Sequence, residues 1–243
     1  MESLYRLFDE YANTYDMTDK EIIYKYEHTY RVVENAKRIA ESLNLSDEDV
    51  KLAMLSGLLH DIGRFEQWTK HKCYMDADTI DHGDYGYEVL LRDDYINEYT
   101  TDEEEKRVIL TSVKYHNKYE IPSGLNEREE LFLKIIRDAD KIDIFYTQSN
   151  KLLEDYEIFL KDELLDDIYN KELCKNAYLT RNEDYIVRQL SWIYDLNFKY
   201  SIKYLDDLKL FDYKLELLSK TKDQEKYNTL KRFIKERIGE LIC

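Results

Sequence analysis

Apolar residues recur every three or four positions along most of the chain, which is the spacing of one face of an α-helix. The runs between them are rich in Glu, Lys and Asp and contain few breakers, since the chain has one proline and six glycines. The pattern therefore predicts an all-α fold. The predicted helices cover about 2–16, 18–43, 47–61, 83–93, 102–118, 127 onward, 182–207 and 223–242.

Capping signals support three of these helix starts. Thr18-Asp19-Lys20-Glu21 and Thr101-Asp102-Glu103-Glu104 match the capping box, and Ser46-Asp47-Glu48-Asp49 resembles another cap with acids in the first turn. Residues 65–82 lack a regular period, so they predict a loop at the mouth of a pocket.

The length of 243 residues suits one large domain or a domain with an appendage. No segment rich in Gly, Pro or Ser separates the two halves. We therefore expect a single helical domain over 1–243, in which the helices after about residue 151 pack on the core. A stripe of apolar residues, Tyr156, Phe159, Leu160, Leu164, Leu165 and Ile168, predicts one of these helices.

The net charge of −16 argues against a general nucleic-acid binder, which would need a basic face, and against an anionic membrane surface as partner. No apolar run is long enough to span a membrane. Cys73, Cys174 and Cys243 are widely spaced and form neither a disulfide framework nor a thiolate metal site. A cytoplasmic protein with reduced thiols is the simplest expectation.

The stretch Leu58-Leu59-His60-Asp61-Ile62-Gly63-Arg64 contains the first candidate chemistry. Imidazole and carboxylate both bind divalent metals of intermediate hardness. Adjacent helical residues point about 100° apart, so one metal reaches both side chains only near a helix end, where we expect Gly63 to let the chain turn away. The alternative is that Asp61 only holds His60 in one tautomer. Arg64 adds a cation suited to phosphate or carboxylate.

Further candidates lie on inward helical faces or at helix starts, and each has a plainer alternative. His28, His82 and His116 are either ligands or half-buried core histidines. Asp140 continues an apolar stripe, where a lone carboxylate needs a metal or a partner such as Arg137 or Lys141. His71 lies in the densest local run of cations and is either a substrate contact or a solvated loop residue.

Taken in order, His28, His60-Asp61, His82, His116 and Asp140 resemble the ligand pattern of the HD-domain metal-dependent phosphohydrolase superfamily. The surrounding stretches also resemble a bacterial branch of HD-domain proteins. They are His60 to Gln67, Ile80 to Gly83, Lys114 to Lys118 and Arg137 to Asp143. The resemblance implies an HD helical bundle over about residues 20–150 with additional C-terminal helices.

The resemblance also implies roles for these residues. His28, His60, Asp61 and Asp140 would bind a first metal, Asp61 would bridge, and His82 and His116 would hold a second. Such donors suit Mn, Fe, Co, Ni or Zn better than Ca or Mg. A bridging hydroxide would attack a small phosphate ester, such as a nucleotide, while Arg64, Lys141 and His71 contact the substrate. Lys141 could instead pair with Asp138 or an acid one turn away.

Two other functions share this ligand set. One is a dinuclear iron oxygenase on the HD fold, and the other is a non-catalytic module that binds a metal or a nucleotide. A missing ligand would favour the module, and none is missing from the sequence. The residues after His116 are Asn117-Lys118-Tyr119, so the Gly-Tyr-Pro motif of cyclic-dinucleotide phosphodiesterases is absent. That particular activity is therefore not expected.

Overall fold

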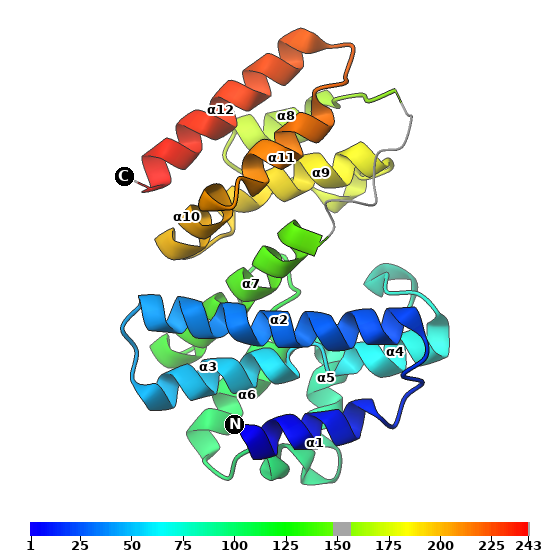
Figure 1. Ribbon diagram of the computed structural model, residues 1–243, viewed down its shortest axis with the longest axis vertical. Coiled ribbons are helices and arrows are strands. Elements are labelled where there is room, and N and C mark those ends of the chain that lie inside the picture. Colours follow the sequence, from blue (N-terminus) through cyan, green and yellow to red (C-terminus); the bar gives the residue numbers. More distant parts are fainter. Residues whose placement is uncertain (148–156, 243) are drawn as a thin grey trace. The chain divides into compact units, whose positions relative to one another are not determined.

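The computed structural model describes residues 1–147 and 157–242 (Figure 1). Every regular element in these residues is a helix, and no strand occurs among them. The predicted all-α fold is therefore confirmed. Tyr156, which we expected on a helical stripe, and Cys243 lie outside the described residues.

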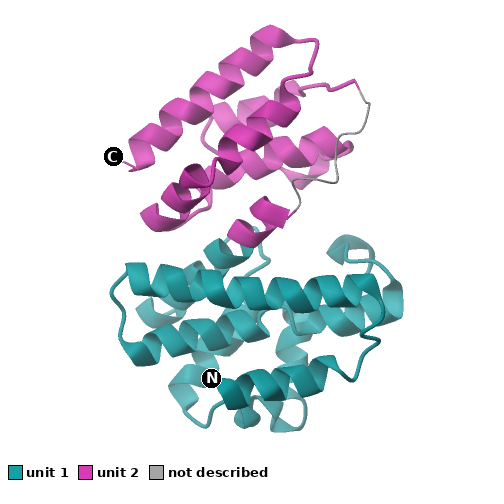
Figure 2. Ribbon diagram, in the orientation of Figure 1, with its two compact units in different colours: residues 1–140 teal, residues 141–243 magenta. Residues whose placement is uncertain are grey.

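The chain divides into two compact units, residues 1–140 and 141–243 (Figure 2). The long helix α7, Glu127–Thr147, contributes residues to both units. The expectation of one domain over 1–243, with the C-terminal helices packed on the core, stays a prediction.

The N-terminal unit has an apolar core to which several of its helices contribute buried residues. Helices α2 and α3 lie side by side in it (Figure 1). Fully buried core residues come from several of the helices and include Phe8, Ala36, Leu58, Phe65, Val113 and Ile136. The elements before α7 are α1 (Glu2–Ala12), α2 (Lys20–Ser42), α3 (Asp47–Leu59), α4 (Gly63–His71), η1 (Asp76–Asp78), α5 (His82–Leu91), η2 (Arg92–Glu98) and α6 (Glu103–Tyr115).

Side-chain caps begin four of these helices. The Ser46 hydroxyl accepts from the Asp49 amide at the start of α3, as the sequence predicts. At α2 and α6 the cap lies one residue later than the Thr of each predicted box, because the carboxylates of Asp19 and Asp102 accept the free amides. Asp81 caps α5 in the same way, which places His82 in the first turn.

Gly63 does not end a helix, contrary to the expectation from the sequence. It is the first residue of α4, and its backbone is not in the left-handed region. Glycine is needed there because α4 and α5 approach too closely for a side chain. A Cβ atom on Gly63 would lie 2.6 Å from the His82 carbonyl oxygen and 2.8 Å from the Gly86 amide nitrogen. This close approach brings the start of α5 beside the His60-Asp61 pair.

The prediction of a loop over 65–82 was wrong for its first half, which continues α4 to His71. The physical reason is burial. Phe65 and Gln67 lie inside the unit, while the polar residues that obscured the period face outward. The remainder, Lys72 to Asp81, is irregular apart from the single turn η1.

The C-terminal unit has its own buried apolar residues, among them Phe145, Leu164, Ile186, Leu205, Phe211 and Ile234. The predicted helix over 182–207 is divided, since Asn197 donates to the Asp195 carbonyl and the chain is not helical between η4 and α10. The last helix starts and ends close to its prediction, whereas α11 was not predicted. The elements are α8 (Asp162–Tyr169), η3 (Asn176–Tyr178), α9 (Asn182–Ser191), η4 (Trp192–Tyr194), α10 (Lys199–Asp207), α11 (Leu210–Leu218) and α12 (Gln224–Ile242).

Candidate metal centre

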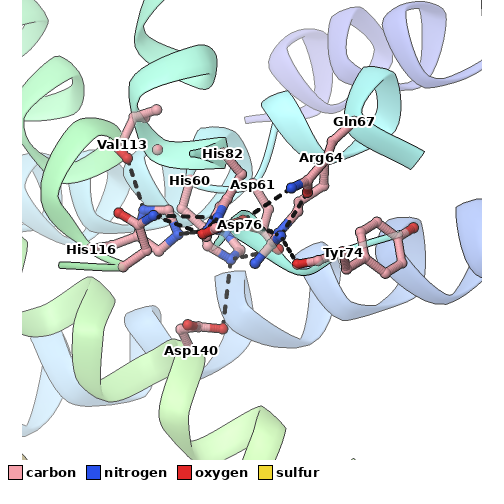
Figure 3. Close-up of polar contacts among 12 residues, drawn as sticks. His60, Asp61, Arg64, Gln67, Tyr74, Asp76, His82, Val113, His116 and Asp140 are labelled. Carbon is pink, nitrogen blue, oxygen red and sulfur yellow. Dashed lines mark hydrogen bonds and ion pairs between the residues drawn. The ribbon is translucent and has the colours of Figure 1, made fainter. Parts of the chain in front are cut away.

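Four histidines from different parts of the N-terminal unit converge inside it, and Figure 3 shows three of them, His60, His82 and His116. His28 comes from the middle of α2, His60 and His116 follow directly after α3 and α6, and His82 opens α5. All four are buried. Residues that are more than thirty positions apart in the sequence therefore meet, as the predicted ligand set requires.

Asp61 lies between two pairs of these histidines. Its Oδ2 atom is 3.4 Å from His28 Nε2 and 3.6 Å from His60 Nε2. Its Oδ1 atom is 3.4 Å from His82 Nε2 and 3.5 Å from His116 Nε2. Each carboxylate oxygen therefore faces a different histidine pair. We call the two sets the first donor group (His28, His60, Asp61) and the second donor group (Asp61, His82, His116).

Asp140 joins the first donor group from α7. Its Oδ1 atom is 3.1 Å from His28 Nε2 and 3.8 Å from His60 Nε2. Burial would raise the pKa of this carboxyl, but His28 and His60 hold it below its usual range. The carboxylate is therefore ionised and available as a donor.

Backbone carbonyls set the orientation of two of the rings. The Nδ1–H of His60 donates to the Gly57 carbonyl at 2.7 Å, and that of His116 donates to the Val113 carbonyl at 2.8 Å. A carbonyl can only accept, so both rings carry a proton on Nδ1 and direct Nε2 at the centre.

The distances between donor atoms fit divalent transition metals. A metal bound at about 2.1 Å by ligands separated by 90–109° has neighbouring ligand atoms about 3.0–3.4 Å apart. His28 Nε2 and His60 Nε2 are 3.3 Å apart, and His82 Nε2 and His116 Nε2 are 3.0 Å apart. Two Nε2 lone pairs at such distances repel each other unless a proton or a metal cation lies between them. The residues present therefore fit metal ions in both donor groups.

Burial also keeps the ligands in the protonation state that a metal needs. It lowers the pKa of His60 to about 4 and that of His82 to about 3, so both imidazoles are neutral near pH 7. For Asp61, burial acts to raise the pKa, but Lys25 and the neighbouring His60 hold it well below its usual range. The bridging position is therefore a carboxylate.

Three side chains that support the site were not identified from the sequence: Lys25 and Arg137, which are buried, and Asp76, which is half-buried. The Lys25 ammonium is 2.7 Å from Asp61 Oδ2. Asp76 Oδ2 accepts from His82 Nδ1 at 2.6 Å. Arg137 donates to the His116 carbonyl at 3.2 Å and so fixes the end of α6. A weak signal existed for Lys25, since it precedes His28 by one helical turn and shares its face.

Arg64 lies beside the site, and its guanidinium contacts acceptors of the protein itself; its contact with a substrate stays a prediction. One terminal nitrogen, Nη1, donates to Gln67 Oε1 at 2.7 Å, to the Tyr74 carbonyl at 2.9 Å and to Asp76 Oδ1 at 2.9 Å. Its Nε atom is 3.6 Å from Asp61 Oδ1. Arg64 is thus held close to the second donor group.

The other two predicted substrate contacts lie in different settings. Lys141 forms an ion pair with Asp195 at 2.7 Å, a pairing that neither sequence alternative named. His71 ends α4 and is exposed to solvent. Contact of Lys141 or His71 with a substrate stays a prediction.

Comparison with protein families assigns the chain. The HD domain matches residues 26–144, an interval that contains all six predicted ligands. This chain is an HD-domain protein. The HD domain places it in a superfamily of metal-dependent hydrolases, in agreement with the two donor groups. Comparisons with curated proteins and with solved structures found no match.

Among the helices of residues 1–147 and 157–242, none is long and apolar enough to cross a membrane.

Proposed function

We propose that this HD-domain protein is a metal-dependent phosphohydrolase that cleaves a small phosphate ester, such as a nucleotide, with two divalent metal ions. His28, His60, Asp61 and Asp140 would hold one ion. The second donor group would hold the other, with Asp61 shared.

The single observation that carries this proposal is the position of Asp61. A carboxylate whose two oxygens face two separate histidine pairs can bridge two cations, whereas a one-metal site needs only one of those pairs. The second pair would otherwise place two buried imidazoles and a carboxylate together with no cation to join them.

The chemistry divides between the ions and the residues. When bound, the ions would supply a water-derived nucleophile at neutral pH and stabilise the charge that develops on phosphoryl oxygens. The Nδ1 hydrogen bonds of His60 and His116 keep their Nε2 atoms aimed at the centre. Arg64 would bind a non-bridging oxygen through its guanidinium.

A phosphate substrate requires a local reversal of the protein's charge. The whole chain carries a net charge of −16, which repels a phosphate dianion. Lys25 and Arg64 lie against Asp61 and place two cations at the site itself. With divalent ions added, the centre becomes the positive region of an acidic protein. Lys141 and His71 remain further proposed contacts.

Two other functions remain as alternatives. A dinuclear iron oxygenase would use the same histidines and carboxylates, so its requirement for O₂ separates it from a hydrolase. A non-catalytic module is disfavoured because all six donor residues are brought together.

The test is a phosphate-release assay on protein of known metal content. Wild type loaded with Mn²⁺ or Fe²⁺ under protective conditions is incubated with nucleotides and other small phosphate esters, with and without O₂. We expect phosphate release from at least one class of ester, independent of O₂ and lost in His60→Ala. Asp47→Ala, which changes an exposed carboxylate on the adjoining helix α3, is the matched control.

Two results would contradict the proposal. One is a product that forms only with O₂, which would favour the oxygenase. The other is the absence of turnover in protein that holds both ions, which would favour the non-catalytic module.

A further inference from the structure

Asp76 is a carboxylate at the centre of a hydrogen-bond network beside the second donor group (Figure 3). Its Oδ2 atom accepts from His82 Nδ1 at 2.6 Å and from Asn117 Nδ2 at 3.2 Å. Its Oδ1 atom accepts from Arg64 Nη1 at 2.9 Å and from Gln67 Nε2 at 3.0 Å. Four side chains from three parts of the chain thus meet on one residue.

The contact with His82 determines which nitrogen can bind a metal. A neutral imidazole has one proton, and a carboxylate partner draws that proton to Nδ1. The Nε2 lone pair then faces Asp61 Oδ1 at 3.4 Å and His116 Nε2 at 3.0 Å. If the proton moved to Nε2, His82 would be unable to ligate at that nitrogen.

His82 differs in this respect from His60 and His116. Backbone carbonyls within the preceding helical turn hold those two rings. His82 opens α5, where the residues before it are not helical, so no carbonyl three residues earlier is available in that geometry. A side chain must supply the acceptor instead, and Asp76 does.

The same carboxylate also holds Arg64. The guanidinium donates to Asp76, to Gln67 and to the Tyr74 carbonyl, while its Nε atom faces Asp61. A plain structural ion pair would need Arg64 alone, whereas the shortest of the four contacts is to the ligand His82.

We propose that Asp76 is a positioning residue that fixes His82 in its Nδ1–H form, sets the metal affinity of the second donor group and links that group to Arg64. The proposal rests on the proposed binding of metal by the second donor group and does not depend on hydrolysis.

The test is Asp76→Asn, which keeps the shape of the side chain and an oxygen for Arg64 and Gln67. Its amide nitrogen would face His82 Nδ1, so that nitrogen must become an acceptor and the proton must move to Nε2. The chain has five histidines, which makes their tautomers readable by ¹⁵N NMR of the metal-free protein. We expect His82 to switch tautomer and affinity at the second donor group to fall by about 10- to 100-fold. Affinity at the first donor group should stay unchanged.

Asp78→Asn is the matched control, because Asp78 lies in the same turn η1 and is exposed. An unchanged His82 tautomer in Asp76→Asn, or an equal loss of affinity at both donor groups, would overturn the proposal and leave Asp76 a structural residue. A wild type that binds one ion would instead refute the two-metal function. The tautomer of the metal-free protein would then still decide the role of Asp76.

Discussion

Each unit buries a lysine, and the two lysines have different surroundings. Lys25, in the N-terminal unit, donates to the Asp61 carboxylate at 2.7 Å. Lys214, in the C-terminal unit, is fully buried, and its Nζ has no hydrogen-bond acceptor within residues 1–147 and 157–242. Its ammonium lies 5.4 Å from the centre of the Phe145 ring. Burial lowers the pKa of Lys214 to about 8.

The two lysines differ in what compensates the burial of their charge. In the N-terminal unit, the buried Lys25 ammonium and Asp61 carboxylate lie among four buried histidines, and these residues include two groups of donors that could hold metal ions. In the C-terminal unit, one cation is desolvated with weak compensation from an aromatic face. Five histidines occur in the chain and all precede residue 141, so the chemistry of HD ligands is confined to one unit.

The largest effect should come from removing the shared carboxylate. Asp61→Ala should lose both ions and lower turnover by roughly four powers of ten or more, because the Asp61 carboxylate faces both histidine pairs. Metal analysis after desalting and a phosphate-release assay measure both outcomes. Retention of one ion would mean that the two donor groups are independent.

His116→Ala should separate the two donor groups. It removes one ligand of the second group and leaves His28, His60, Asp61 and Asp140 in place. We expect about one ion per chain and a loss of turnover of several powers of ten. If the wild type itself binds one ion and His116→Ala binds the same number, the two-metal mechanism is ruled out.

Lys25→Met should destabilise the metal-free protein by roughly 3 kcal/mol, because it leaves the Asp61 carboxylate buried beside neutral imidazoles. Metal should remove most of this loss, since a divalent cation also compensates Asp61. Urea unfolding followed by fluorescence suits this test, because Trp68 lies in the N-terminal unit and Trp192 in the C-terminal unit. Lys37→Met, at a partly exposed lysine on the same helix, is the control.

The corresponding substitution at Lys214 should change the free energy of unfolding in the opposite direction. Lys214→Met removes a desolvated cation and keeps an apolar stem, so we expect stabilisation of about 2 kcal/mol at pH 7. Urea unfolding monitored by the fluorescence of Trp192 measures this change in stability. A loss of stability would mean that the ammonium has a favourable role in the C-terminal unit.

The stability that Lys214→Met gains over the wild type should decrease as the pH rises above about 8. The folded-state pKa of Lys214, about 8, lies below its ordinary value of 10.5, so the unfolded chain binds more protons between these two values. The wild type should therefore gain stability relative to Lys214→Met as the pH rises from 8 towards 10.5. Below pH 8 the difference should be constant.

Local signals in the sequence predicted the positions of several helices. Helical periodicity and caps located α2, α3, α5, α6 and α12 to within a few residues, because both depend on neighbours within one or two turns. Prediction failed where distant contacts decide. The irregular turn at residues 195–198 divided a continuous period, and Gly63 was assigned to a helix end when its role is to admit α5.

The sequence by itself predicted the candidate donor residues, since their type and order match the HD pattern, and the HD domain covers the interval that contains them. Only the tertiary structure decided how each side chain is used. The contacts of Asp61 with Lys25, and of His82 with Asp76, depend on backbone paths and ring orientations that periodicity does not specify. A period identifies which face of a helix turns inward, whereas a metal site depends on which single atoms meet there.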